Sequence, residues 1–178
     1  MKRSVISAAV LTAVFMSAGA FAVDSDQGEL VITGKVTGTT CKFVGDTTAT
    51  IGMNQIGADR LNALTPGGVY DGYSNQTTTP LTVECTGTEA PRITFSSSQF
   101  DSANKYITRN TASSNGAGFA VYYGNDFTQQ VNPGTGINLT KTSDNKYILN
   151  FKARYAKAGN AVTAGDVASS LTMTVVTD

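Results

Sequence analysis

The sequence of 178 residues contains no histidine and only two cysteines. Without histidine, neither a Ser-His-Asp nor a Cys-His catalytic arrangement can form, and metal sites built on imidazole are excluded too. Two cysteines alone do not complete a zinc or copper site. These absences exclude the commonest hydrolytic and metal-dependent sites, and we expect no cofactor and no bound metal.

An excess of charge of one sign is also lacking. The chain has 13 basic and 13 acidic residues, and the basic ones form no block. If an N-terminal segment carrying Lys2 and Arg3 is removed, as argued below, 11 basic residues (13 − 2) remain against 13 acidic ones. Nucleic acid and anionic membranes are therefore poor candidates as partners.

Two features leave chemistry on sugars open. A pair of carboxylates could serve a glycosidase. Adjacent Tyr122 and Tyr123 could stack on a sugar, or place one ring in the core and the other against a neighbour. The available acids lie in tails and turns, where solvated charge is the usual explanation: Asp24/Asp26, Asp59/Asp71 and Glu84/Glu89. Neither signal is specific, and we predict that the protein is not an enzyme.

The start of the chain has the pattern of an export signal. Lys2 and Arg3 precede an apolar run over residues 5–18, and Ala20-Phe21-Ala22 has the A-x-A form of a cleavage site. The run is too short for a membrane anchor. We expect residues 1–22 to be a signal peptide and the mature, exported chain to begin at Val23.

Export gives the two cysteines a specific interpretation. Cys41 and Cys85 in an exported chain favour one disulfide over a metal site or a reactive thiol. For a bridge of this span, the chain-entropy model gives about 4 kcal/mol of stabilisation. Two free buried thiols are the alternative.

Short alternating segments separated by Gly, Pro, Asn and Ser dominate the mature chain. Alternation with period two is typical of half-buried strands. One short helix is expected between Met53 and Leu64, before Pro66-Gly-Gly68 breaks it. The predicted strands are 28–36, 41–44, 49–51, 80–85, 92–96, 118–123, 146–155 and a last one from 167. This pattern predicts an all-β fold, a β-sandwich of immunoglobulin-like type.

The first and last of these segments have no obvious partner. In the last one Val167, Leu171, Met173 and Val175 share a face, and its uncharged edge invites pairing with another chain. In the first, one face carries Gly28, Leu30, Ile32, Gly34 and Val36. The alternative is that both are ordinary strands of their own sheets.

Four stretches together resemble the chaperone–usher fimbrial (pilus) subunits of the type 1 pilin-like family. They are Glu29–Val36, with Gly34 seven positions before Cys41; Leu81–Cys85; Phe151–Tyr155 followed by Val162–Gly165; and Gly165 itself, fourteenth from the end. One position departs from the family pattern. The penultimate residue is usually Tyr, and here it is Thr177.

The resemblance implies a mechanism. Family subunits have an immunoglobulin-like sandwich without its seventh strand, which leaves a groove along the final strand. A periplasmic chaperone lends a strand to the groove, and at the outer-membrane usher the N-terminal extension of the next subunit replaces it. The product is a fimbria on the bacterial cell surface.

Carried onto this chain, the resemblance assigns roles to segments. It implies an N-terminal donor-strand extension over residues 23–37 and a pilin domain over residues 38–178. The donor strand would present Gly28, Leu30, Ile32, Gly34 and Val36. The groove and its chaperone-pairing strand would use Gly165, Val167, Leu171, Met173 and Val175.

Three functions are compatible with these observations. The first is a structural shaft subunit. The second is a minor adaptor, or a directly adhesive subunit that binds a host glycan or protein receptor. The third is a self-contained secreted sugar-binding module or hydrolase, which fits a sandwich but leaves the alternating segment 28–36 unexplained.

Overall fold

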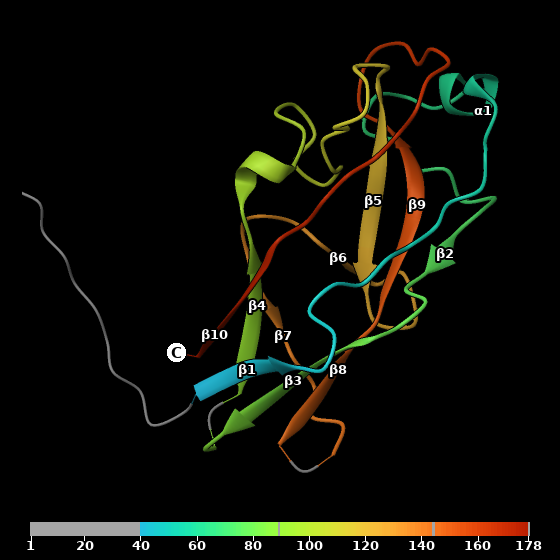
Figure 1. Cartoon of the computed structure of the whole chain (residues 1–178). Helices are drawn as coiled ribbons and strands as arrows, with labels where there is room; N and C mark the ends of the chain where they lie inside the picture. The colour runs from blue at the N-terminus through green and yellow to red at the C-terminus, as the bar shows by residue number, and fades with distance from the viewer. Residues whose placement is uncertain (1–39, 89, 144, 178) are drawn as a thin grey trace, which may run out of the picture. The chain divides into compact units, whose positions relative to one another are not determined.

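The computed structural model describes residues 40–88, 90–143 and 145–177, which lie within one compact unit of the chain. The predicted signal peptide and donor-strand extension fall outside these residues. The regular secondary structure of the described part is almost all β-strand, with one short α-helix and one 3₁₀ turn (Figure 1). Short strands with alternating burial build it, as the period-two pattern predicts.

Three antiparallel sheets make up the fold. In the first, β1 (Thr40–Val44) and β8 (Lys146–Leu149) flank β3 (Leu81–Thr86). In the second, β10 (Met173–Thr177) and β7 (Ile137–Asn138) flank β4 (Pro91–Phe95). The third has the order β2 (Asn75–Gln76), β9 (Phe151–Lys157), β5 (Ala117–Tyr123) and β6 (Gln129–Gln130).

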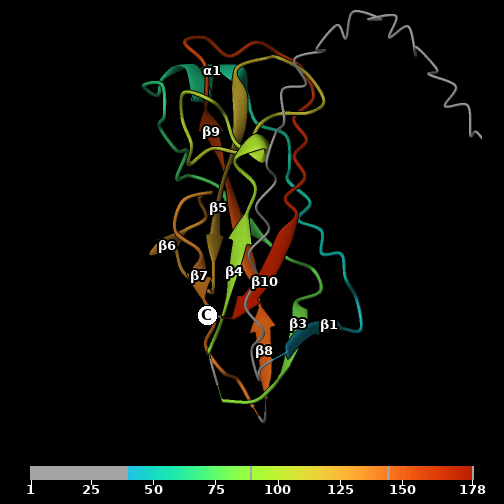
Figure 2. The ribbon, with the colours of Figure 1, turned by 90° about the vertical axis from the view of Figure 1, so that its left-hand side faces the viewer.

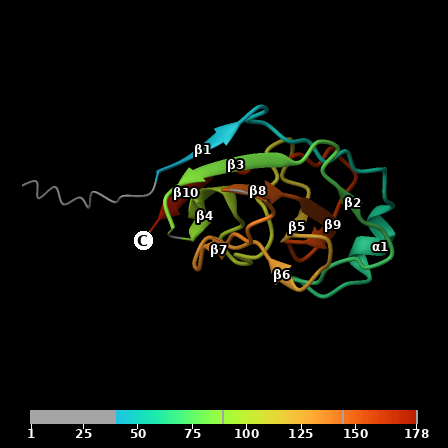
Figure 3. The ribbon, with the colours of Figure 1, turned by 90° about the horizontal axis from the view of Figure 1, so that it is seen from below.

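The main core lies between the sheet of β3 and the sheet of β4, whose strands face each other in Figures 2 and 3. Alternate residues of both strands supply it, and Leu81, Val83 and Ile93 are buried almost completely. Each such aliphatic side chain contributes about 1.5–3 kcal/mol on burial. The predicted all-β fold of immunoglobulin-like type is confirmed.

The predicted strand 146–155 is in fact two strands in two sheets. β8 pairs with β3 and β9 pairs with β5, and the change of sheet occurs at Asn150. The Asn150 carbonyl accepts a hydrogen bond from the Gly124 N–H at 2.8 Å. Because Leu149 and Phe151 on either side are both buried, the alternation continues through the break and conceals it in the sequence.

The last strand is shorter than the sequence predicted. β10 begins at Met173, which pairs with Phe95 at the end of β4. Residues 167–172 extend beyond that end, so β4 offers them no ladder. Ala168 in this segment is bonded instead to the loop 108–115, through its carbonyl to the Thr111 N–H and through its N–H to Asn110 Oδ1. A ladder needs a neighbouring strand, and the alternation of one segment does not reveal where its neighbour stops.

Two further segments differ from expectation. Residues 49–51 join no strand of the described sheets, although the Thr50 carbonyl accepts a hydrogen bond from the Thr78 N–H at 3.1 Å. The helix is α1 (Ala58–Asn62), one turn within the predicted region. Met53, Ile56 and Leu64 lie outside α1 but pack with Leu61 in one apolar cluster. These residues are apolar because they share this cluster, and this explains why their spacing resembles that of a helix although most of them lie outside α1.

A buried amine holds α1 in place. Lys157 at the end of β9 is only 5% exposed, and its Nζ donates to the carbonyls of Asn62 at 3.2 Å and Leu64 at 2.9 Å. These carbonyls lie at the C-terminal end of the helix, where cations are favourable. Lys157 lies just beyond the predicted strand 146–155, yet it closes β9 and makes a structural contact.

Candidate functional site: a groove between two extended segments

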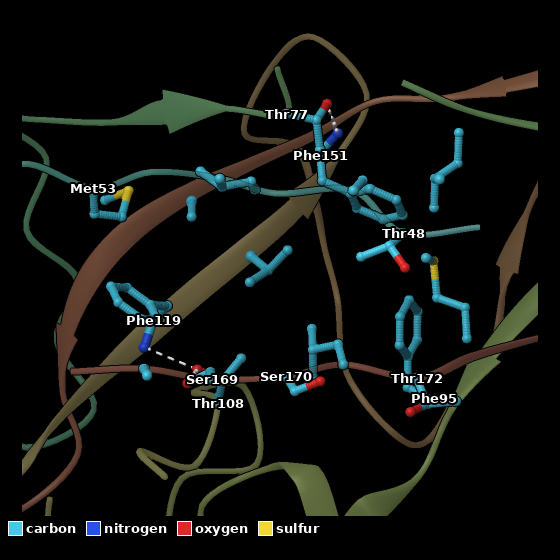
Figure 4. Close-up of a pocket in the computed structure, with 18 of the residues that line it drawn as sticks. Thr48, Met53, Thr77, Phe95, Thr108, Phe119, Phe151, Ser169, Ser170 and Thr172 are labelled. Atoms are coloured by element: carbon cyan, nitrogen blue, oxygen red, sulfur yellow. Dashed lines mark hydrogen bonds between the residues drawn. The ribbon is translucent and has the colours of Figure 1, made fainter. Parts of the chain in front are cut away.

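An open groove of about 590 Å³ runs between two extended segments of the chain (Figure 4). One wall is formed by residues 47–53, which follow β1, and the other by residues 167–173, which precede and begin β10. The floor comes mainly from β5 and β9, through Phe119, Val121, Phe151, Ala153 and Tyr155. None of the described residues that line the groove is charged.

The wall formed by residues 167–173 shows strict alternation. The side chains of Val167, Ser169, Leu171 and Met173 are half-buried, whereas those of Ala168, Ser170 and Thr172 are exposed. One set of side chains therefore faces the floor and the other faces solvent.

The backbone of the same wall alternates too. The carbonyl of Ala168 accepts from the Thr111 N–H at 2.8 Å, on the side away from the groove. Successive backbone groups of an extended chain point in opposite directions. The groups of Val167, Ser169 and Leu171 therefore face the groove, and no backbone hydrogen bond joins them to any other described residue.

The opposite wall is built in the same way. The carbonyl of Thr50 accepts from the Thr78 N–H and Oγ1, and the carbonyl of Gly52 accepts from Asn75 Nδ2. Within the described part of the chain, the backbone groups of the alternate residues Ala49 and Ile51 make no hydrogen bond. Each wall thus resembles a strand edge with one ladder missing.

The floor of the groove is apolar, and aromatic rings of β5 pack against aromatic rings of β9. The rings of Phe119 and Tyr155 lie 5.1 Å apart, and those of Tyr123 and Phe151 lie 5.8 Å apart. Tyr155 Oη donates to the carbonyl of Asn54 at 2.9 Å, which ties the floor to the first wall. Burial raises the pKa of Tyr155, and nearby Tyr73 adds to the shift. The floor therefore presents a fixed hydrophobic surface with no charge at neutral pH.

Three of the five residues that the sequence predicted for the groove line it, and the other two lie nearby. Val167, Leu171 and Met173 line the groove. Val175 is half-buried against the main core, further along β10, and does not line it. Gly165 lies at the bend that leads into the wall, with φ +155°, beside Ser113 and Asn115. The predicted donor residues, Gly28 to Val36, lie outside the described residues.

Sequence reasoning missed the first wall and the floor as parts of a site. Residues 47–53 resemble a short strand and a helix start in sequence, and Phe119 and Phe151 resemble ordinary core residues. The signal that was available is the alternation of Thr48, Thr50 and Gly52 with the apolar Ala49, Ile51 and Met53. It is too short to indicate an open edge by itself.

The adjacent tyrosines do not form a shared sugar-binding platform. Tyr122 is 7% exposed and packs against Phe127, with ring centroids 5.1 Å apart. Tyr123 points to the opposite face and packs against Phe151. Burial raises the pKa of both tyrosines, partly offset by Arg154 near Tyr122 and by a hydrogen bond at Thr140 for Tyr123. Both rings serve packing.

The predicted disulfide is present. Cys41 and Cys85 are bonded, and they face each other directly in the register of β1 and β3, with Cα atoms 4.1 Å apart. In the described residues, no group of three or more acidic or cysteine side chains could hold a metal ion. No helix of the described part is long and apolar enough to cross a membrane.

The described residues thus form an immunoglobulin-like sandwich with a groove between two edges that no other described strand pairs. Comparison with known proteins identifies its family. Residues 30–177 match the family described as Fimbrial protein. The chain is also 36% identical, over the full length of both sequences, to the uncharacterized fimbrial-like protein YehD of Escherichia coli K12. The chain belongs to the fimbrial protein family, and the predicted resemblance is confirmed.

Solved structures agree on the fold. A chain in the structure of a chaperone–usher pilus is 16% identical, with a TM-score of 0.58, over 86% of this chain and 97% of that one. The P pilus rod subunit PapA is 17% identical, with a TM-score of 0.52, over 85% of this chain and all of that one. At these identities the likeness shows a shared fold. Family membership makes this chain a fimbrial subunit, a component of a surface pilus.

Proposed function

We propose that this chain is a structural shaft subunit of a chaperone–usher fimbria and polymerises by donor-strand exchange. The observation that carries the proposal is the groove, because it is faced by backbone groups of both walls that pair with no other described residue. A strand inserted there would bond to Ile51 on one side and to Val167 and Leu171 on the other. Its alternate side chains would cover the floor, which is β-augmentation between chains.

Residues 28–36 of a neighbouring subunit are the proposed occupant. Leu30, Ile32 and Val36 would point to the floor, and together they would contribute about 4–9 kcal/mol at about 1.5–3 kcal/mol each. Each backbone bond to a wall adds about 0.5–1.5 kcal/mol. Gly34 would fill a shallow position on the same face. The sum makes release from the fibre slow.

Before assembly, the same groove would be covered by a strand of a periplasmic chaperone, and the exchange would occur at an outer-membrane usher. The uncharged lining of the groove and its apolar floor support this. A groove of this kind exposed in the periplasm would favour aggregation, so a temporary occupant is needed. The export signal predicted at residues 1–22 fits this route.

Truncation tests the proposal. Removing residues 23–36 should leave a subunit that forms its disulfide and is recovered with its chaperone, yet cannot add to a fibre. Gly34→Leu should act in the same direction and leave the subunit folded. Copurification and fibre yield measure both effects. If the truncated chain still polymerises, or fails to fold even with chaperone, the donor-strand assignment is wrong.

A minor adaptor would use the same groove and differ in copy number. Electron microscopy of fimbriae labelled with an antibody to this subunit separates the two roles. Labelling along the whole shaft supports the proposal, and labelling only at one end supports the adaptor.

A further inference from the structure

The groove wall that precedes β10 needs support from outside the sheet. β4 ends at Phe95, which pairs with Met173, so residues 165–169 lie beyond any ladder. An extended segment without a ladder would be expected to adopt many conformations, at an entropy cost for any partner that orders it. Here the loop 108–115 provides the support through side chains.

Asn110 is the centre of this support. Its Oδ1 accepts hydrogen bonds from the N–H groups of Ala112 and Ala168, each at 3.0 Å. Its Nδ2 donates to Asn115 Oδ1 and to the carbonyl of Asp166, also at 3.0 Å each. One amide thus shapes its own loop and bonds both Asp166, just before the wall, and Ala168 within it, using its acceptor and its donors.

Neighbouring side chains reinforce the same contacts. Ser113 Oγ donates to the carbonyl of Asp166 at 2.6 Å, and Asn115 Nδ2 donates to the carbonyl of Gly165 at 3.1 Å. Further along, Thr108 Oγ1 donates to Ser169 Oγ at 2.7 Å. We call residues 108–115 the asparagine clamp.

Gly165 is adapted to the clamp. A Cβ on this glycine would lie 3.2 Å from Ser113 Oγ and 3.4 Å from Asn115 Nδ2, and its φ of +155° is one that other residues rarely adopt. The bend therefore brings the wall close enough for the clamp to reach its carbonyls.

The clamp also decides which backbone groups stay available. After the bend at Gly165, it bonds the backbone of Asp166 and Ala168, the even-numbered residues. Because backbone groups alternate in direction along an extended segment, the groups of Val167 and Ser169 then point into the groove. The clamp thus holds one set of groups so that the other is presented to an incoming strand.

We propose that Asn110 is a positioning residue that preforms the acceptor edge of the groove before any strand binds. This rests on the proposed function of the groove as a strand acceptor. An incoming strand with alternating apolar side chains meets an edge that is already extended, with backbone groups directed into the groove. The free energy of binding therefore does not include the entropy cost of ordering that edge. Loss of the clamp should slow association much more than it speeds dissociation.

The test is the full-length mature chain carrying Asn110→Asp, in complex with its chaperone. The new carboxylate keeps the acceptor contacts of Asn110 but has no donor for the carbonyl of Asp166. Asn132→Asp is the matched control. Asn132 Oδ1 likewise accepts from the N–H groups of Gly134 and Thr135, in a loop that contributes no groove-lining residue.

The probe is a synthetic peptide of residues 23–37, added to each complex, with strand exchange followed in time. Asn110→Asp should reduce the exchange rate about tenfold, since each lost donor bond is worth up to about a factor of ten. The thermal unfolding midpoint of the peptide-filled subunit should change little. A purely structural residue would lower that midpoint and leave the exchange rate unchanged.

Ser113→Ala keeps the test decisive if Asn110→Asp does not fold. It removes the bond that Ser113 Oγ donates to the carbonyl of Asp166 and the one that it accepts from Asn110 Nδ2, and it should slow exchange by a smaller factor. Wild-type exchange rates in both clamp variants would overturn the role of Asn110 and leave the proposed function intact. If the wild-type subunit itself does not take up the peptide, the proposed function fails instead.

Discussion

At Tyr155 a single hydroxyl connects the floor of the groove to one of its walls. The ring is 7% exposed and Oη donates to the carbonyl of Asn54. Burial raises the pKa of this phenol, so the unfolded chain loses the proton first as pH rises. The stability contributed by the neutral phenol is therefore present below about pH 10 and falls as pH rises above it.

Tyr155→Phe should lower the unfolding free energy at neutral pH by about 1 kcal/mol, because the hydrogen bond to Asn54 is lost. Above about pH 10 the difference between variant and wild type should shrink, because only the wild type keeps losing stability there through this residue. Denaturant unfolding from about pH 7 to about pH 11 measures both effects. Tyr106→Phe, at a ring that is 57% exposed, is the matched control. A gap that widens with pH would contradict the account.

At the scale of single residues, the sequence predicted the disulfide but not the hydrogen bonds between side chains and distant backbone groups. The disulfide between Cys41 and Cys85 followed from export and an even cysteine count, and the structure confirms it. The clamp at Asn110 and the buried amine of Lys157 were not predicted. Both depend on backbone carbonyls brought near by the fold, and no local pattern in the sequence marks a side chain that will meet them.

At the scale of the element, the segment 167–173 is the part of the groove that the sequence described best. Its alternation identified the face that carries Val167, Leu171 and Met173. Its length in the sheet was overestimated, because the end of β4 at Phe95 is fixed by tertiary structure. The opposite wall was missed, because residues 47–53 are held as an edge by contacts with residues 75–78.

The alternation of this element makes a direct prediction. Leu171→Asp should place a carboxylate among apolar groove contacts and weaken strand binding by several kcal/mol, since a buried unpaired charge is costly. Thr172→Asp is the matched control, because the neighbouring side chain is exposed. Recovery of each variant from the periplasm with its chaperone measures the effect. Recovery of Leu171→Asp at the level of Thr172→Asp would show that Leu171 does not contact the occupant.

At the scale of the whole molecule, the sequence predicted the fold class and the family, and both are confirmed. Strand alternation and turn residues carry the fold class because they repeat along the whole chain. The division into three sheets could not be predicted, since the buried face continues unbroken through Asn150. Which strand edges remain unpaired depends on the arrangement of all the strands. The groove was therefore inferred from the family resemblance and not from the alternation of apolar residues in the sequence.

Assembly is the property that links these scales. Under the proposed function, a subunit with an open, uncharged groove gains its missing ladder from another chain, and a fibre forms when every subunit both accepts and donates a strand. The central claim is that residues 28–36 of one subunit occupy the groove of the next.

Photo-crosslinking in assembled fimbriae tests this claim most directly. A benzophenone amino acid replaces Ile32, and fimbriae are grown from a mixture of isotope-labelled and unlabelled subunits so that crosslinks between chains are recognised by mass. The account predicts crosslinks between different subunits, to groove residues such as Phe119, Ile51 and Leu171. Crosslinks confined to single subunits, or to residues outside the groove, would contradict it.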